Sequence, residues 1–384
     1  MKIPFNRPTA VGAELDNIAD VLARGHLSGD GHYTKRCHQW LEERLGCRHA
    51  LLTHSGTGAL DMAAILCDLA LGDEVIMPSY TFVSTANAFV LRGAVPVFVD
   101  IRADTLNLDE RLIAAAITPR TKAIAVVHYA GVACEMDTIM ALAGRHHLLV
   151  VEDAAQALLA TYQGRCLGTI GHLGCVSFHE TKNLISGEGG ALLVNDERLA
   201  ERAEVIREKG TNRSRSLRGE VDKYTWVDIG SSFLPGELTA AFLDAQFARA
   251  DEVSARRRVV WQRYHDGLHG LAAAGVIELP PRSYDDRRAN GHLFHLLAGT
   301  PEIRLALAAY LKARGIHPVS HYVPLHTSPG GRKWGRASGE LKVTDNISDR
   351  LLRLPIYFGI SDAEVDAVIE AVSRFYARRN TNMS

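Results

Sequence analysis

Residues 148–156 read LLVVEDAAQ, and residues 175–190 read CVSFHETKNLISGEGG. The apolar runs that open both segments predict buried strands. The first strand ends at a carboxylate, Asp153, and Lys182 follows the second strand, just before a glycine-rich turn. Pyridoxal phosphate (PLP) needs a lysine amine for its aldehyde, a carboxylate for its pyridine nitrogen and a cradle for its phosphate. The two segments therefore raise the hypothesis of a PLP site.

The composition is that of an ordinary globular protein, with 47% hydrophobic and 23% charged residues among 384. A net charge of −1 gives no electrostatic attraction for nucleic acid or an anionic membrane. The cysteines form no C-x-x-C pair, so we expect reduced thiols and no metal site. The N-terminus lacks an apolar signal core, and no apolar run is long enough to span a bilayer. We therefore expect a cytoplasmic protein without membrane or nucleic-acid partners.

Apolar runs alternate with helical periodicity through the first half of the chain. The predicted strands are residues 50–53, 74–78, 95–100 and 123–128, and the predicted helices are residues 59–69, a segment starting at 79, 108–117 and 136–145. Repeated strand–helix–strand units predict the α/β class, with a mostly parallel sheet covered on both faces. Ligands of such sheets bind outside the carboxyl ends of the strands. Because Thr57, Phe82, His128 and Asp153 follow strands, we expect them to converge on one crevice.

A glycine-containing turn between the first predicted strand and its helix is a candidate phosphate cradle. Gly56 and Gly58 let the backbone approach a ligand, and the helix N-terminus offers free N–H groups and the positive end of the dipole. An ordinary strand-to-helix turn is the alternative interpretation. A dinucleotide-binding turn fits less well, because Asp61 stands where the third glycine of G-x-G-x-x-G belongs.

A long polar stretch, residues 210–234, follows a charged helix predicted at residues 196–209. Loops of this length inside a compact protein are usually functional or disordered. The stretch contains Arg213, Arg215, Arg218, Lys223, Tyr224 and Trp226. Arginines clustered beside aromatic residues suit a phosphorylated ligand with a stacking base, and a solvated excursion is the alternative.

The last third of the chain changes character. One long helix is predicted at residues 239–268, followed by shorter strands and helices that end in a helix at residues 361–378. We therefore expect a large α/β domain of residues 1–245 and a smaller C-terminal α+β domain of residues 246–384.

These parts occur in the order found in the sugar aminotransferases of fold type I, the PLP enzymes that are similar to aspartate aminotransferase. The resemblance covers nearly the whole chain. It rests on Ser55-Gly56-Thr57, Pro78-Ser79-Tyr80-Thr81-Phe82, Glu152-Asp153-Ala154-Ala155-Gln156, Ser177-Phe178-His179-Glu180-Thr181-Lys182-Asn183, Gly187-Glu188-Gly189-Gly190 and Pro324-Leu325-His326. Within the family, Lys209-Gly210-Thr211-Asn212-Arg213-Ser214 and Asp222-Lys223-Tyr224-Thr225-Trp226 resemble the branch of dTDP-4-amino-4,6-dideoxygalactose transaminases, which act on dTDP-4-keto-6-deoxyglucose.

The resemblance implies a mostly parallel central sheet in the large domain, PLP as cofactor, and a role for each matching residue. Lys182 would form the Schiff base with PLP and carry the proton during catalysis. Asp153 would pair with the pyridine nitrogen, Gln156 would hydrogen-bond the phenolic oxygen, and Phe82 would stack on the ring. The residues that would bind the phosphate are Gly56, Thr57 and Ser177.

The resemblance also places substrate contacts in two loops and implies a homodimer. The implied substrate-binding residues are Lys223, Tyr224, Trp226, His321, Tyr322 and His326. Many relatives carry Gly-x-Asn-x-Arg, whose Asn reaches the phosphate of PLP in the neighbouring subunit. This chain has Gly230-Ser231-Ser232-Phe233-Leu234 instead. Ser232 would then take that position with a shorter side chain.

The implied reaction moves an amino group from L-glutamate to C4 of a dTDP-4-keto-6-deoxyhexose, leaving 2-oxoglutarate and a dTDP-4-amino-4,6-dideoxy sugar. A nucleotide-linked 4-ketopentose is an alternative substrate, because discrimination of one carbon by apolar contacts is modest. Two other classes are a PLP-binding regulator without catalysis and an NAD-dependent oxidoreductase that uses the Gly56 turn. The presence of both Asp153 and Lys182 favours catalysis over either.

Overall fold

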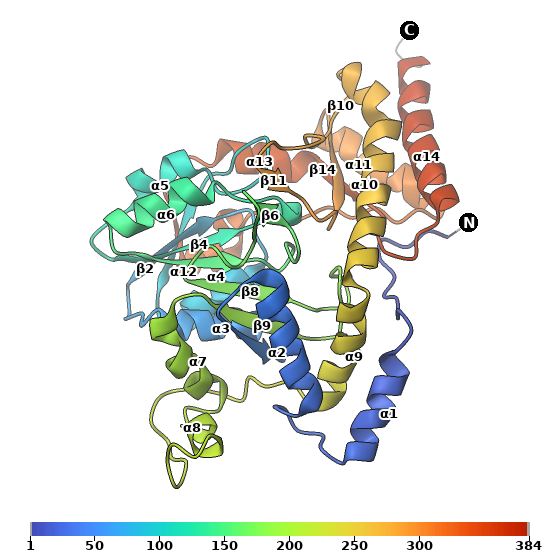
Figure 1. Ribbon diagram of the computed structural model, residues 1–384. Helices are drawn as coiled ribbons and strands as arrows, with labels where there is room; N and C mark the ends of the chain where they lie inside the picture. Colours follow the sequence, from blue (N-terminus) through green and yellow to red (C-terminus); the bar gives the residue numbers. More distant parts are fainter. Residues whose placement is uncertain (1, 382–384) are drawn as a thin grey trace.

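An eight-stranded sheet forms the centre of the computed structural model, which describes residues 2–381 (Figure 1). The strands are arranged in the order β1-β9-β8-β5-β4-β2-β3-β13. Their bounds are β1 (His49–Thr53), β2 (Glu74–Pro78), β3 (Val95–Val99), β4 (Thr121–Val127), β5 (Leu149–Asp153), β8 (Leu173–Ser177), β9 (Gly190–Val194) and β13 (Arg336–Ala337). Only β9 runs antiparallel to its neighbours within this sheet. The mostly parallel sheet that the apolar strands predict is confirmed.

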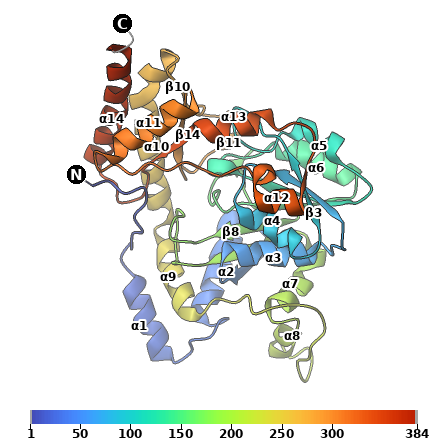
Figure 2. The ribbon, with the colours of Figure 1, turned by 180° about the vertical axis from the view of Figure 1, so that it is seen from behind.

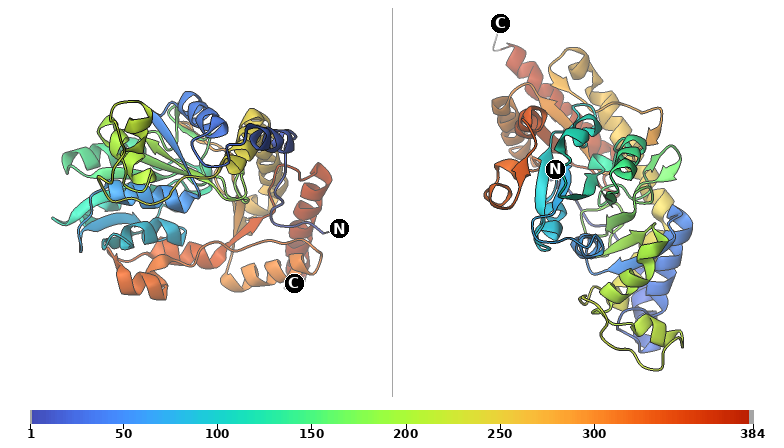
Figure 3. Two further views of the ribbon diagram at one scale, coloured as in Figure 1. Left: turned by 90° about the horizontal axis from the view of Figure 1, so that it is seen from below. Right: turned by 90° about the vertical axis from the view of Figure 1, so that its left-hand side faces the viewer.

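Helices cover both faces of the sheet, as the view from below shows (Figure 3). One face packs against α2 (His32–Leu45), α5 (Glu110–Ala116), α6 (Met136–Arg145) and α9 (Glu237–Ala248), and the other against α3 (Gly56–Leu66), α4 (Val83–Val90) and α7 (Ala200–Arg207). Successive strand residues alternate between these faces: Ile76 belongs to the first core, and Val75 and Met77 belong to the second. Because both faces are buried, the strands are mostly apolar, and the polar residues that they contain, such as Glu74 and Glu152, have hydrogen-bond partners.

The C-terminal part has its own apolar core and a three-stranded antiparallel sheet. Its elements are β10 (Ile277–Glu278), β12 (Phe294–Ala298) and β14 (Leu351–Leu354), with α10 (Ala250–Ala273), α11 (Pro301–Lys312), α13 (Lys342–Arg350) and α14 (Asp362–Thr381). The chain also returns to the large sheet, because α12 (Pro329–Trp334) leads into β13 beside β3 (Figure 2). The division of the chain at residue 245 stays a prediction.

Two smaller features complete the fold. A three-stranded sheet joins β6 (Thr161–Tyr162), β7 (Arg165–Cys166) and β11 (Arg287–Arg288), and short 3-10 turns occur at Tyr129–Gly131, Glu197–Leu199 and Leu325–Thr327. The N-terminal segment runs from the C-terminal part, where Ile3 pairs with Ile316, to α1 (Glu14–Arg24) beside α9 (Figure 2). It therefore passes the edge of the sheet where the strands end.

Two predicted helices have other boundaries in the structure, and the long polar stretch is not a continuous loop. The helix expected from residue 79 begins at Val83, because Phe82 keeps an extended backbone with φ −72° and ψ 149°. The helix expected at residues 239–268 is two helices, because Arg249, with φ −112° and ψ 15°, leaves the helical region between α9 and α10. The polar stretch at residues 210–234 contains a short helix, α8 (Arg213–Leu217).

Within residues 2–381, no helix has both the length and the apolar character needed to cross a membrane.

Candidate active site

The carboxyl ends of β1, β4, β5 and β8 meet at one edge of the large sheet, where a cavity of about 600 Å³ opens. The predicted residues that line it are Gly56, Thr57, Phe82, Asp153, Gln156, Ser177, Lys182, His321 and Tyr322. The first seven come from the large sheet and its loops, and the last two come from the C-terminal part. The cavity therefore lies where both parts of the chain meet.

Lys182 lies in the connection between β8 and β9. Three backbone hydrogen bonds close this connection at its base, from the N–H of Phe178 to Gly189 O (2.8 Å), from Glu180 to Gly187 O (2.8 Å) and from Ser186 to Phe178 O (2.7 Å). Burial lowers the pKa of Lys182, although the nearby charge of Asp153 opposes the shift. A lysine with a lowered pKa is more often a neutral amine, which is the nucleophilic form.

Asp153 is the last residue of β5, and both of its carboxylate oxygens accept hydrogen bonds. Oδ2 accepts from the hydroxyl of Thr85 over 2.6 Å, and Oδ1 accepts from the N–H of Ala155 over 3.1 Å. These bonds fix the rotation of the carboxylate at the wall of the cavity. A charged carboxylate held in this way suits the protonated nitrogen of a pyridine ring.

The turn between β1 and α3 has the form of an anion cradle. Ser55 caps α3, because its hydroxyl accepts the N–H of Gly58 over 3.0 Å. The N–H groups of Gly56 and Thr57 belong to the first turn, where helix geometry leaves them without partners in the helix. A Cβ on Gly56 would lie 2.7 Å from Cβ of Ser177, so only glycine permits this close approach. The hydroxyls of Ser177, Thr57 and Ser84 line the same wall.

The aromatic and amide groups opposite the cradle are linked across the two parts of the chain. Gln156 accepts the N–H of Ala130 through Oε1 (2.7 Å), so its Nε2 faces the hydroxyl of Tyr322 and donates to it over 2.8 Å. Phe82 lines the cavity, its ring centroid is 6.3 Å from that of Tyr322, and 55% of the residue stays exposed. The cavity therefore has an open aromatic wall beside the buried polar end.

His292 lines the cavity and was missed by the sequence analysis. Asn183 donates from Nδ2 to Asn290 O (3.4 Å), which turns its Oδ1 toward His292 and makes Nδ1 of His292 the donor in their 2.9 Å bond. Burial holds the pKa of His292 well below its usual value, so the ring is neutral. Its Nε2 is then a hydrogen-bond acceptor. No motif pointed to this residue, because its partners lie far away in the sequence.

Two arginines in the cavity were also missed. Arg353 on β14 donates to Ser320 O over 2.9 Å and lies 4.7 Å from the ring centroid of Phe5, yet its Nε is buried without a partner. Among residues 2–381, no carboxylate lies within 4 Å of it. Arg257 bonds only to backbone carbonyls, and burial lowers its pKa to about 10. The cavity therefore carries positive charge that suits an anionic ligand.

Other predicted site residues lie outside the cavity of this chain. The lining of the cavity does not include Lys223, Tyr224, Trp226 or Ser232, so their predicted roles stay predictions. The first three follow α8, which extends below the body of the molecule (Figure 1), and Ser232 pairs with Glu208. His326 binds Ser79 Oγ through Nδ1 (2.7 Å) and lies 3.2 Å from Asp345, so here it fixes a turn; its predicted substrate contact stays a prediction.

One expectation about charged groups needs correction, and the phosphate contacts expected of the loop arginines stay a prediction. His128 follows β4 but is fully buried and outside the cavity, because its Nε2 bonds to Glu152 over 2.8 Å. The loop arginines expected to bind phosphate already have acidic partners. The pairs are Arg213–Glu208 (3.6 Å), Arg215–Glu201 (3.0 Å) and Arg218–Glu204 (2.8 Å). Their guanidinium groups are therefore engaged within the same subunit.

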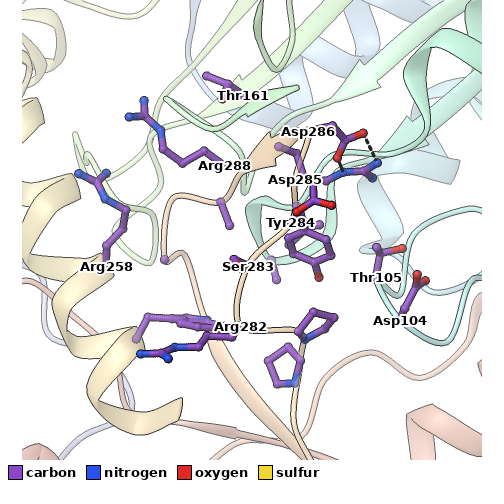
Figure 4. Close-up of a pocket in the computed structure, with 18 of the residues that line it drawn as sticks. Asp104, Thr105, Thr161, Arg258, Arg282, Ser283, Tyr284, Asp285, Asp286 and Arg288 are labelled. Atoms are coloured by element: carbon purple, nitrogen blue, oxygen red, sulfur yellow. Dashed lines mark hydrogen bonds and ion pairs between the residues drawn. The ribbon is translucent and has the colours of Figure 1, made fainter. Parts of the chain in front are cut away.

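A second hollow, of about 680 Å³, lies between α10 and the loop before β11 (Figure 4). Tyr284 points into it, and Arg258 and Arg288 stand along one side (Figure 4). Its Arg287 is fixed by Asp286 (2.7 Å) and by Glu135 (2.8 Å). This hollow holds neither the lysine nor the aspartate, so the chemistry belongs to the first cavity.

Comparisons with known proteins identify the family of the chain. The sequence model of the DegT/DnrJ/EryC1/StrS aminotransferase family matches residues 8–373. The spore coat polysaccharide biosynthesis protein SpsC of Bacillus subtilis is 35% identical over 96% of this chain and 96% of its own. DesV of S. venezuelae, solved in complex with a ketimine intermediate, is 34% identical with a TM-score of 0.88 over 97% of this chain and 98% of its own. The PLP form of Spr1654 from Streptococcus pneumoniae is 25% identical with a TM-score of 0.89 over 98% and 99%.

Proposed function

The chain belongs to the DegT/DnrJ/EryC1/StrS aminotransferase family and is a PLP-dependent sugar aminotransferase, and from this premise we propose that it transfers the amino group of L-glutamate to C4 of a dTDP-4-keto-6-deoxyhexose. The observation that carries the proposal is the geometry of Lys182, which shares one cavity with Asp153, the Gly56 cradle and an arginine without an acidic partner. The identity of the sugar rests on the likeness of residues 209–226 to the dTDP-4-keto-sugar branch.

The residues present fit PLP. When bound, PLP supplies an aldehyde that combines with amines and a ring that accepts electrons from a neighbouring carbon. Asp153 would face the ring nitrogen, and Gln156 has a second amide hydrogen for the phenolic oxygen. Gly56, Thr57 and Ser177 would hold the phosphate through N–H and hydroxyl groups.

Lys182 would act twice as the proton carrier. With a lowered pKa, its Nζ can take the Cα proton of the amino donor in the first half of the reaction. In the second half, Nζ returns a proton to C4 of the sugar. The loop that holds Lys182 is closed by three backbone bonds, so the amine is held near both reacting carbons.

Arg353 supports glutamate as the donor. Its guanidinium offers a planar set of N–H donors, of which Nε is buried and unused. Glutamate carries two carboxylates, and a guanidinium binds a carboxylate through two parallel hydrogen bonds. Arg353 would therefore hold one donor carboxylate close to Lys182, whose pKa already responds to the arginine's charge.

We also propose that the working enzyme is a homodimer in which the loop of residues 210–232 reaches the partner's cavity. In one chain this loop leaves Trp226 78% exposed and Tyr224 59% exposed, while the cavity wall at Phe82 stays open. Aromatic rings of this kind are typical of ligand contacts and subunit interfaces. The same loop carries Lys223, a charge for the nucleotide's phosphates.

The direct test is to incubate the PLP-loaded protein with L-glutamate and dTDP-4-keto-6-deoxyglucose and to identify the product by NMR. We expect an amino group at C4 and 2-oxoglutarate in equal amount. Parallel reactions with a nucleotide-linked 4-ketopentose and with a UDP-linked keto sugar define the acceptor. If the cofactor spectrum does not change with glutamate, the donor is wrong, and if only the pentose is aminated, the acceptor is wrong.

A further inference from the structure

Asp153 is held by a buried hydroxyl that does not itself line the cavity. Thr85, on α4, is 0% exposed, and its Oγ1 donates to Oδ2 of Asp153 over 2.6 Å. Oδ1 of the same carboxylate accepts the backbone N–H of Ala155 over 3.1 Å. Each oxygen thus has one fixed donor from the protein, and the carboxylate cannot rotate without breaking one of these bonds.

A second hydroxyl, from Thr81 at the cavity wall, bonds to the first. Thr81 is 1% exposed, and its Oγ1 is 2.8 Å from Oγ1 of Thr85. A threonine hydroxyl has a single proton, and Thr85 gives that proton to Asp153. The bond between the two threonines must therefore run from Thr81 to Thr85. The two hydroxyls thus form a chain that runs from Thr81 through Thr85 to the Asp153 carboxylate.

We propose that Thr85 is a positioning residue for the cofactor, because its hydroxyl orients the Asp153 carboxylate so that the remaining lone pairs face the cofactor's pyridine nitrogen. The inference rests on the proposed role of Asp153. Valine has nearly the shape of threonine but lacks the hydroxyl, so Thr85→Val would leave Oδ2 of Asp153 without this donor while keeping the packing. Thr85→Ser keeps the hydroxyl and loses one methyl group.

The chain contains a matched control outside the lining of the cavity. Thr344, also 0% exposed, donates from Oγ1 to Oδ1 of Asp100 over 2.7 Å. Asp100 and Asp153 are each 6% exposed. Thr344→Val therefore removes the same kind of buried threonine-to-aspartate bond at a place where no cofactor would bind. Any general cost of losing such a bond is common to both variants.

The experiment compares wild type, Thr85→Val, Thr85→Ser and Thr344→Val. For each protein we would measure the dissociation constant of PLP by titrating the cofactor-free form, the visible absorption band of the bound cofactor, and the midpoint of thermal unfolding. We expect Thr85→Val to weaken PLP binding about tenfold and to shift the band. Thr85→Ser should restore both, and Thr344→Val should lower the unfolding midpoint only.

Asp153→Asn separates this inference from the proposed function. If Asp153→Asn binds PLP with the wild-type affinity and spectrum, the role of Asp153 itself is wrong. If Asp153→Asn is impaired and Thr85→Val is not, only the inference about Thr85 fails. An equal loss of PLP affinity in Thr344→Val also overturns it.

Thr85→Val added to Asp153→Asn should have little further effect on PLP affinity, because the two residues act as one unit. Should Thr85→Val fail to fold, Thr85→Ala replaces it with the same expectations.

Discussion

The cavity around Lys182 and the loop of residues 210–232 use their polar groups in different ways. In the cavity, hydrogen bonds point inward and fix single atoms, as Thr85 fixes Asp153 and Ala130 fixes Gln156. In the loop, arginines pair with glutamates at the surface, and Trp226 stays exposed. The comparison teaches that a single chain positions the residues proposed to bind the cofactor. The aromatic residues proposed to hold the nucleotide do not line the cavity of the same chain.

The largest expected effect on turnover is that of Lys182→Ala, which changes the cavity and leaves the loop of residues 210–232 as it is. Lys182→Ala removes the proton carrier while leaving the loop intact, so turnover should fall about 1,000-fold or more. Stopped-flow spectra of the PLP-loaded variant with L-glutamate would measure the first half-reaction, and product analysis would measure the whole. Binding of dTDP to the variant should be unchanged. Turnover near the wild-type rate would contradict the assignment of Lys182.

Arg353→Met tests the cavity side of the comparison. Loss of the guanidinium should raise the KM for L-glutamate about 10- to 100-fold, since a charge-assisted bond to a carboxylate is removed. The rate of the glutamate half-reaction at increasing donor concentration measures this effect. The KM for the keto sugar nucleotide should change little.

Arg288→Met is the control for Arg353→Met, because Arg288 is an arginine that lines the second hollow and not the cavity of Lys182. It should leave the KM for both substrates unchanged. An Arg353→Met enzyme that keeps its glutamate KM but loses affinity for the sugar nucleotide would show that the arginine binds the diphosphate instead.

Trp226→Ala tests the proposed role of the loop. Its effect should be smaller and should fall on the half-reaction with the sugar nucleotide. Loss of one stacking ring should raise the KM for the sugar nucleotide about tenfold and leave the glutamate half-reaction unchanged. Steady-state kinetics with each substrate varied in turn would show the split. A mixture of Lys182→Ala and Trp226→Ala subunits should form hybrid dimers with one intact site. At a sugar-nucleotide concentration well below the KM of Trp226→Ala, the activity of the mixture should therefore exceed that of either parent. No gain on mixing would count against a loop shared between subunits.

Variants that remove ion pairs outside the site should have the smallest effect on turnover, because these pairs contribute to the free energy of unfolding. Glu74 is fully buried. Burial raises its pKa, but hydrogen bonds from Arg336, Thr118 and Arg120 outweigh this effect and lower the pKa from 4.5 to about 2. Because the folded pKa is lowered, this stabilisation is present above pH 4.5 and is lost as the pH falls toward 2. Glu74→Gln should therefore cost about 3 kcal/mol at neutral pH.

The pH dependence of unfolding provides the check for Glu74. The difference in the free energy of unfolding between wild type and Glu74→Gln should shrink as the pH falls from about 4.5. Arg218→Met, at the exposed loop, should hardly change the unfolding midpoint, because such pairs are screened by water and salt. A large cost for Arg218→Met would show that the loop is as firmly built as the cavity.

The sequence by itself determined the fold class and the cofactor end of the site. Short apolar runs with no polar face that alternate with helical patterns are typical of strands buried on both sides, so the pattern predicted the covered, mostly parallel sheet. Residues that stand at strand ends, such as Thr57, Asp153 and Ser177, meet at one edge for the same reason. Their chemistry follows from short local motifs, which the sequence displays directly.

Only the tertiary structure decided which distant residues complete the cavity. Arg353 comes from β14 and His292 from the segment just before β12, both in the C-terminal part, and Phe5 comes from the N-terminal segment. Thr85 could be taken for an ordinary helix residue until its hydroxyl is seen beside Asp153. Such roles depend on contacts between segments more than sixty residues apart, and spacing along the chain carries no trace of them. The charge of Arg353 and the orientation of Asp153 are therefore products of packing, whereas the choice of lysine and aspartate is written in the sequence.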